Sequence, residues 1–207
     1  MMVVALFLVH FSCSTYAVTQ SYQLQHFEQL VLAGHYQANF TQANHYVVSV
    51  TAKNLDNIHV AISGNKIIVK QKSQFPDDES LFRINISAPV LTHATLSGNY
   101  QANFILPNGK SFALDTRGQG DVTLMGKFKR LSINNKGSLI MQAKNACAQA
   151  IEVRSLGNLN AIFCADSNAP FNRTIIGRAD ITIYGKPMFE KALGFGAVNI
   201  RSIQADN

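Results

Sequence analysis

The sequence predicts an all-β protein in which an antiparallel N-terminal part continues into a short parallel β-helix, or β-solenoid. Three observations predict this fold class: glycines at a fixed period, an alternating apolar pattern after each of them, and hairpin signals in the N-terminal part. The periodic glycines are separated by 20, 19, 20, 20 and 19 residues, which indicates stacked coils. These predicted turn glycines are Gly98, Gly118, Gly137, Gly157, Gly177 and Gly196.

The residues after each glycine alternate between apolar and polar. The fourth and sixth positions are apolar in every repeat except the last, where Ser202 takes the sixth, and the fifth position is mostly polar. This alternation predicts a half-buried strand in each coil. Strands at constant phase are most simply stacked in parallel, about 4.8 Å apart, in about five coils of about 20 residues. The apolar pairs are Ala102 and Phe104, Val122 and Leu124, Met141 and Ala143, Ala161 and Phe163, and Ile181 and Ile183.

A second apolar pair precedes most of the glycines by six and four residues. It is clear in three coils, as Phe112 and Leu114, Leu131 and Ile133, and Ile151 and Val153. It then decays, since the next coil has Arg173 at the second of these positions and the last coil has Glu190 at the first. The pattern predicts a second strand in each coil and a looser C-terminal end.

The stretch from residue 22 to residue 72 reads as antiparallel β-structure. Apolar residues at 46, 48 and 50 form one alternating strand, and those at 58–62 and 67–69 flank Gly64-Asn65, a pair that favours a hairpin turn. Residues 74–79 form a polar loop, and a strand from residue 81 to residue 86 ends at Ala88-Pro89. Residues 34–40 match residues 98–104 in six of seven positions, so the two parts are expected to form one continuous structure.

The N-terminal segment predicts export. Residues 1–17 contain no Asp, Glu, Lys or Arg, and an apolar run is followed by small residues that end at Ala17. This favours a secretory signal peptide, followed by a single domain over residues 18–207, with an antiparallel part at 18–90 and glycine-ladder coils at 91–207. A buried N-terminal strand and a lipoprotein signal on Cys13 remain the alternatives.

Two cysteines would remain after removal of the signal peptide. Cys147 lies ten residues past one ladder glycine and Cys164 seven past the next, so a disulfide is feasible if the coil around Cys147 bulges. An even number suits an oxidising compartment. The other interpretation is two unpaired cysteines packed as small apolar residues.

No catalytic, metal or cofactor site is predicted. Asp121 and Asp180 share the third position after a glycine but lie three coils apart, about 14 Å, beyond the spacing of a glycosidase carboxylate pair. With Gln101, Asn160 and Asn199, they read as a solvated ladder. The histidines that follow the predicted leader show no metal-ligand spacing. They are His26, His35, His45, His59 and His93.

The net charge is +6 and the isoelectric point about 9.3. The densest basic group is Lys127, Lys129, Arg130 and Lys136. One interpretation is that this group binds an anionic envelope polymer or lipopolysaccharide. The other is that it forms an ordinary solvated face that prevents aggregation. Nucleic acid is not an expected partner, because the leader predicts export and the sequence has no platform of aromatic residues interleaved with basic ones.

The order of these elements resembles the family of putative autotransporter adhesins with a "head GIN" domain. The resemblance rests on Phe27, Leu30 and Leu32 before Gly34, the Gly64 hairpin, the 84–91 segment and the glycine ladder, closed by residues 183–187 and 194–198. It covers about residues 27–201. It implies an exported or envelope protein with a right-handed β-helical core, and it brings no catalytic residues.

The expected function is therefore a non-catalytic interaction or adhesion module of the periplasm, the outer envelope surface or the secreted fraction. Its ligand stays open between an anionic polymer, a glycan and a protein surface. The alternatives are a carbohydrate-active enzyme and a structural periplasmic scaffold. An open solenoid end is also an unpaired sheet edge, so self-association is expected unless residues 200–207 cap it.

Overall fold

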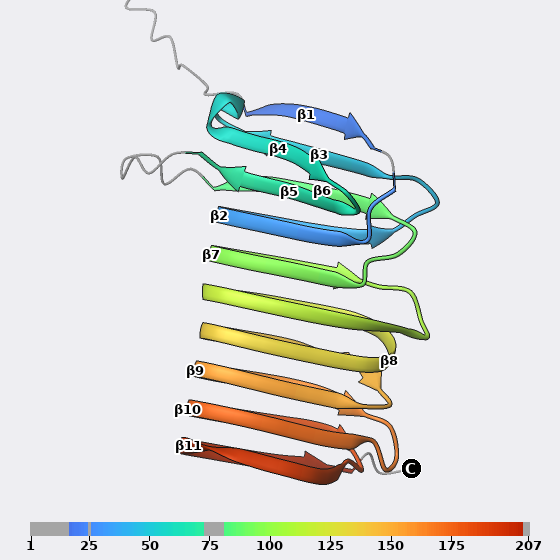
Figure 1. The fold of residues 1–207 in the computed structure, drawn as a ribbon, viewed down its shortest axis with the longest axis vertical. Coiled ribbons are helices and arrows are strands. Elements are labelled where there is room, and N and C mark those ends of the chain that lie inside the picture. The colour runs from blue at the N-terminus through green and yellow to red at the C-terminus, as the bar shows by residue number, and fades with distance from the viewer. Residues whose placement is uncertain (1–16, 25, 73–80, 205–207) are drawn as a thin grey trace, which may run out of the picture.

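The computed structural model describes residues 17–24, 26–72 and 81–204, and the protein is all-β (Figure 1). The only helical element among these residues is the 3-10 turn η1 (Leu55–Asn57). The strands are β1 (Val18–Gln23), β2 (Gln29–Gln42), β3 (Val47–Ala52), β4 (Ile58–Ser63), β5 (Lys66–Gln71), β6 (Phe82–Ala88), β7 (His93–Ile105), β8 (Lys110–Ala148), β9 (Ile151–Ala165), β10 (Pro170–Gly185) and β11 (Met188–Ile203).

All these strands belong to one mixed 11-stranded sheet. Its order is β1-β3-β6-β2-β7-β8-β9-β10-β11, with β5 also paired to β2 and β4 paired to β5. From β6 to β11 the strands named in this order are parallel, so the chain passes in the same direction through each successive layer. Figure 1 shows these layers stacked along the long axis, with β1 near one end and β11 at the other.

Each long layer bends at a glycine, and the glycines of neighbouring layers lie directly on one another. The pairings include Gly34 with Gly98, Gly98 with Gly118, and Gly157 with both Gly137 and Gly177. All of these glycines have positive φ, which residues with a Cβ rarely adopt. β8 is long enough to contain two bends, at Gly118 and Gly137. The predicted period therefore corresponds to one layer of the stack.

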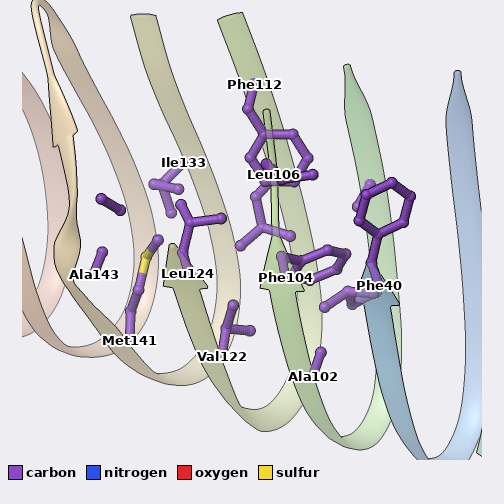
Figure 2. Close-up of a cluster of buried hydrophobic side chains, with 14 of the residues drawn as sticks. Phe40, Ala102, Phe104, Leu106, Phe112, Val122, Leu124, Ile133, Met141 and Ala143 are labelled. Atoms are coloured by element: carbon purple, nitrogen blue, oxygen red, sulfur yellow. The ribbon is translucent and has the colours of Figure 1, made fainter. Parts of the chain in front are cut away.

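The core fills the space between the two arms of the bent layers. Figure 2 shows Phe112 and Ile133 on the arm before the bend, facing Phe104, Val122 and Leu124 from the arm after it. All five side chains are buried. Both apolar patterns of the sequence thus face one continuous core, and alternation places the polar residues on two outer faces.

Buried polar side chains stabilise the bend itself. Asn135 lies two residues before Gly137, and its Nδ2 donates to the carbonyl of Asn158 at 3.1 Å and to Ser155 Oγ at 3.0 Å. Its Oδ1 accepts from Thr116 Oγ1 at 3.0 Å. These bonds satisfy polar groups that would otherwise be buried without partners where the strands turn.

The N-terminal part is antiparallel only in some of its strands. β1 with β3, β3 with β6, and β4 with β5 are antiparallel, but β2 runs parallel to β5, β6 and β7. The expectation of an antiparallel region over residues 18–90 is therefore wrong for β2. The reason is the internal echo: residues 34–40 lie in register on residues 98–104, so β2 is an additional layer of the parallel stack.

Other local predictions are confirmed. The hairpin around Gly64 joins β4 to β5, with Ser63 opposite Lys66, and β6 ends at Ala88 before Pro89. The weaker C-terminal pattern corresponds to β11, which is almost entirely exposed. Its pairing with β10 shifts register between Phe171 and Asn172, which leaves Glu190 of β11 out of the pairing. The predicted leader with Cys13 and the polar loop at 74–79 lie outside the described residues.

Candidate functional site

The outer face beside the arms that follow the bends carries two rows of polar side chains, here called the polar face. Each row crosses six strands, and its members are aligned by strand pairing. The first row is Thr19, Thr51, Arg83, Gln37, Gln101 and Asp121, and the second is Ser21, Ser49, Asn85, Asn39, Asn103 and Thr123.

Hydrogen bonds between side chains connect most of the first row. Arg83 Nε donates to Gln37 Oε1 at 3.3 Å, and Gln37 Nε2 donates to Gln101 Oε1 at 2.9 Å. At the edge of the sheet the hydroxyls of Thr19 and Thr51 lie 2.8 Å apart.

The second row is connected in the same way. Asn103 Nδ2 donates to Asn39 Oδ1 at 3.0 Å, and Asn39 Nδ2 donates to Asn85 Oδ1 at 3.1 Å. The Ser21 and Ser49 hydroxyls lie 2.7 Å apart. Because each amide is held by a neighbour, the face presents ordered donors and acceptors and loses little side-chain entropy when a ligand binds.

A shallow depression of about 240 Å³ opens on this face beside the bends of β2 and β7. The polar groups His35, Gln37, Asn99, Gln101 and Asp121 line it together with exposed Leu81. The buried rings of Tyr36 and Tyr100 complete its lining. The depression therefore places several hydrogen-bonding groups beside a small apolar surface.

The two tyrosines stack on each other, with ring centroids 5.9 Å apart. Burial raises the pKa of Tyr36 far above its usual range and raises the pKa of Tyr100 to about 12. The Tyr100 hydroxyl is buried and has no hydrogen-bond partner among the described residues. Thr116 lies beside it and lowers its pKa, but the Thr116 hydroxyl donates its own proton to Asn135.

We expect Tyr100→Phe to leave stability at neutral pH unchanged or raise it by about 1 kcal/mol, because it removes a buried, unpaired hydroxyl. Since the folded pKa lies above the unfolded value of about 10, ionisation of this phenol takes no stability from the parent below pH 10. The parent then loses stability as the pH rises from 10 towards 12, because the unfolded state ionises first. The variant should therefore lose less stability than the parent between pH 10 and 12, measured by urea unfolding. A loss of more than 1 kcal/mol at pH 7 would mean that the hydroxyl has a partner.

The opposite outer face, beside the arms that precede the bends, carries a charged depression of about 240 Å³. Asp115 accepts from Asn134 at 3.0 Å and lies 2.8 Å from His93 Nε2, while Glu152 pairs with Arg154 at 2.8 Å. Asp115 and Glu152 thus line one depression, and each is held by neighbouring polar groups. This pair of carboxylates was missed by the sequence analysis, which considered only acids at the same position of the repeat.

The residues that the sequence placed in one solvated ladder are aligned as expected. Gln101 pairs with Asp121, and Asn160 pairs with Asp180, which in turn pairs with Asn199. Ile140 opposite Asn160 interrupts the polar row between the two acids, and Asp180 instead lies 3.5 Å from Arg201. The structure therefore does not bring Asp121 and Asp180 together.

The predicted basic group is divided between two places. Lys127, Lys129 and Arg130 are exposed around the turn at Phe128, whereas Lys136 lies next to the bend glycine Gly137. The straight arm of residues 131–135 separates them. The four cations therefore form no single patch.

Among the histidines, His26 contacts the Tyr46 hydroxyl at 2.7 Å and Glu28 at 3.4 Å, and His93 contacts Asp115. No group of three or more His, Cys, Asp or Glu side chains that could hold a metal occurs in residues 17–24, 26–72 and 81–204.

Cys147 and Cys164 face each other on β8 and β9 and form a disulfide, with their Cα atoms 4.3 Å apart. The register of these strands shifts between Ala143 and Cys147, so the chain bulges beside Cys147. The bulge brings the two residues into direct opposition despite their different positions in the repeat.

The polar face is the main feature that the sequence analysis missed. The match between residues 34–40 and 98–104 was a signal for half of it, because that match places Gln37 on Gln101 and Asn39 on Asn103. No comparable signal marked Arg83 and Asn85, whose position depends on the pairing of β6 with β2.

The bent strands stack into an elongated all-β protein whose outer faces carry rows of polar side chains. The chain belongs to the family of putative auto-transporter adhesins with a head GIN domain, whose family model matches residues 26–187. The resemblance seen in the sequence is thereby confirmed. In the described part of the chain, no helix has the length and apolar character required to cross a membrane.

Solved structures of low sequence identity share the fold. A putative adhesin from Bacteroides fragilis NCTC 9343 is 17% identical with a TM-score of 0.68, over 92% of this chain and 98% of that one. A putative adhesin from Parabacteroides merdae ATCC 43184 is 14% identical with a TM-score of 0.54, over 90% and 96%. A putative lipid binding protein from Parabacteroides distasonis ATCC 8503 is 14% identical with a TM-score of 0.51, also over 90% and 96%. A comparison with curated proteins finds no match.

Proposed function

We propose that this chain is an exported, non-catalytic interaction module of the adhesion type, and that the polar face is its contact surface. In this proposal residues 1–17 are a cleaved signal peptide. Residues 18–207 then form one domain, a right-handed β-solenoid whose coils are the stacked layers. The adhesin description of the family and the disulfide of Cys147 and Cys164 support an exported protein.

The observation that carries the proposal is the pair of hydrogen-bonded rows across β1, β3, β6, β2 and β7. Five of the six members on β6, β2 and β7 are amides, neutral groups that both donate and accept, which suits a ligand rich in hydroxyls; the sixth is Arg83. Adjacent strands are spaced by about 4.8 Å. This spacing is close to the length of one sugar unit in an extended polysaccharide. A glycan chain lying across the strands could therefore meet equivalent side chains on successive layers, with His35, Asp121 and Leu81 in the depression beside them.

The first experiment is protease digestion of intact cells that express the protein, with lysed cells as the control. Digestion on intact cells is the expected result, because an adhesive surface must be accessible from outside. Protection until lysis would place the protein in the periplasm and contradict the adhesion role.

The contact surface is tested with the double variant Gln37→Ala, Asn39→Ala, which interrupts both rows on their central strand. We expect binding to the strongest glycan on a printed array to weaken at least about 10-fold, since bonds to two ordered amides are lost. The matched control is Asn160→Ala, Thr182→Ala, which removes outward polar groups from β9 and β10 outside the rows. An equal loss in the control would contradict the assignment of the surface.

The same array tests for catalysis. Release of shortened glycan products that is abolished by Asp115→Asn or Glu152→Gln would contradict a non-catalytic function and indicate a carbohydrate-active enzyme. We expect no release, since the proposed function is non-catalytic.

A further inference from the structure

The two ends of the stack are finished differently. At the N-terminal end, β1 is a short edge strand of 6 residues whose sequence, VTQSYQ, is mainly polar. At the C-terminal end, β11 has 16 residues and pairs only with β10 among the described strands. A long, exposed edge strand is a template for further strand pairing unless charges, bulges or a covering segment block it.

β11 also exposes an unusual number of large apolar side chains. Phe195 is 83% exposed, and Phe189 and Leu193 are more than half exposed. Phe195 continues an apolar row at the bend, where it pairs with Ile176, which pairs with Leu156, and both of these are exposed too. Val198 and partly buried Ile200 cover the last core layer on one side, and no layer formed by the described residues lies on their other side. This end of the core is therefore covered on one side only.

A strand that pairs along all of β11 must have the same bent shape. β11 turns at Gly196, with eight residues from Met188 to the bend and seven from the bend to Ile203 (196−188 and 203−196). The arms are thus nearly equal. β1 cannot provide such a partner because it is less than half as long.

We propose that β11 pairs with β11 of a second copy of this chain, in a two-fold, end-to-end dimer centred on Gly196. A two-fold axis through the bend exchanges the two arms. The arm that runs towards the bend in one copy then lies on the arm that runs away from it in the other, so both pairs of arms are antiparallel. The pairing closes on itself and produces a dimer instead of a fibre.

This register brings together residues at equal distances from Gly196. Leu193 of one copy lies opposite Asn199 of the other, and Phe195 lies opposite Ala197, all on the outer faces. Between the arms, Ile200 lies opposite Ala192, so each copy covers the open core of its mate. Lys191 of one copy lies opposite Arg201 of the other near the ends of the arms. Each cation has an acid close by, since Glu190 precedes Lys191 and Asp180 lies 3.5 Å from Arg201. The contact therefore has a mainly apolar centre and a charged rim.

The test uses the exported protein, purified from expressing cells, and measures its mass by light scattering after gel filtration. The parent is expected at twice the chain mass. Two charge variants, Leu193→Glu with Asn199→Glu and Leu193→Lys with Asn199→Lys, place like charges opposite each other twice per dimer. Each should be monomeric, with the dimer dissociation constant raised at least about 100-fold. Ile140→Glu, an exposed position on a middle layer, is the control and should remain dimeric.

An equimolar mixture of the two charge variants should form a one-to-one heterodimer, because each Glu then faces a Lys. This mixing experiment distinguishes charge repulsion from a loss of folding, because an unfolded variant would not form the heterodimer. Circular dichroism of each variant checks its folding directly. A monomeric parent at about 100 μM, a charge variant that stays dimeric, a mixture that stays monomeric or a parent that forms longer assemblies would each overturn the proposal. A monomeric parent would mean that β11 does not pair with a second copy of this chain.

Discussion

Substitution Gly137→Ala is expected to unfold the protein or destabilise it by at least about 4 kcal/mol, the largest effect we predict for one methyl group. A Cβ atom on this glycine would lie 2.1 Å from the backbone carbonyl oxygen of Gly118 in the layer below. Neither backbone can move away without breaking the hydrogen bonds of both layers. The backbone of Gly137 also has a φ of 140°, which is strained for any residue with a Cβ.

The matched control is Gly64→Ala in the β4–β5 hairpin. Gly64 also has positive φ, 61°, but a Cβ there would meet nothing within 4 Å. Gly64→Ala should lower the free energy of unfolding by about 1 kcal/mol, the strain of the left-handed backbone conformation alone. Urea unfolding of both variants separates the two contributions, and similar losses at the two positions would contradict close stacking of the bend glycines.

Removal of the Cys147–Cys164 disulfide is expected to cost about 3 kcal/mol. The two cysteines are separated by 17 residues, and a loop of that size restricts the unfolded chain by about this amount. The variant is Cys147→Ala with Cys164→Ala, measured by urea unfolding without reductant. The parent should lose about as much stability when dithiothreitol is added, and the variant should lose none.

Thiol titration of the unfolded, unreduced protein provides the control. The mature chain should contain no free thiol, because Cys13, the third cysteine of the sequence, lies in the predicted leader. Two thiols per chain would mean that Cys147 and Cys164 are unpaired in the exported protein, and reductant would then have no effect.

The comparison of sequence and structure differs between the parallel layers and the N-terminal part. The parallel layers were predictable because each repeat carries its own alternation and its own glycine, and equal phase leaves parallel stacking as the simplest pairing. β2 was placed wrongly because the long insertion between Gly34 and Gly98 hides the period. Residues 43–92 supply β3 to β6 in that interval, and the regular spacing resumes only at Gly98.

The sequence alone therefore determined the all-β class, the stacking of glycines and the family, since these depend on residue type and local spacing. Only the tertiary structure decided which polar side chains meet. Arg83 lies beside Gln37, and Asn85 beside Asn39, because β6 pairs with β2 in one register, and a shift of one residue would turn these side chains to the other face. The depression beside His35 and the open end at β11 arise in the same way, from how distant strands are paired and where pairing stops.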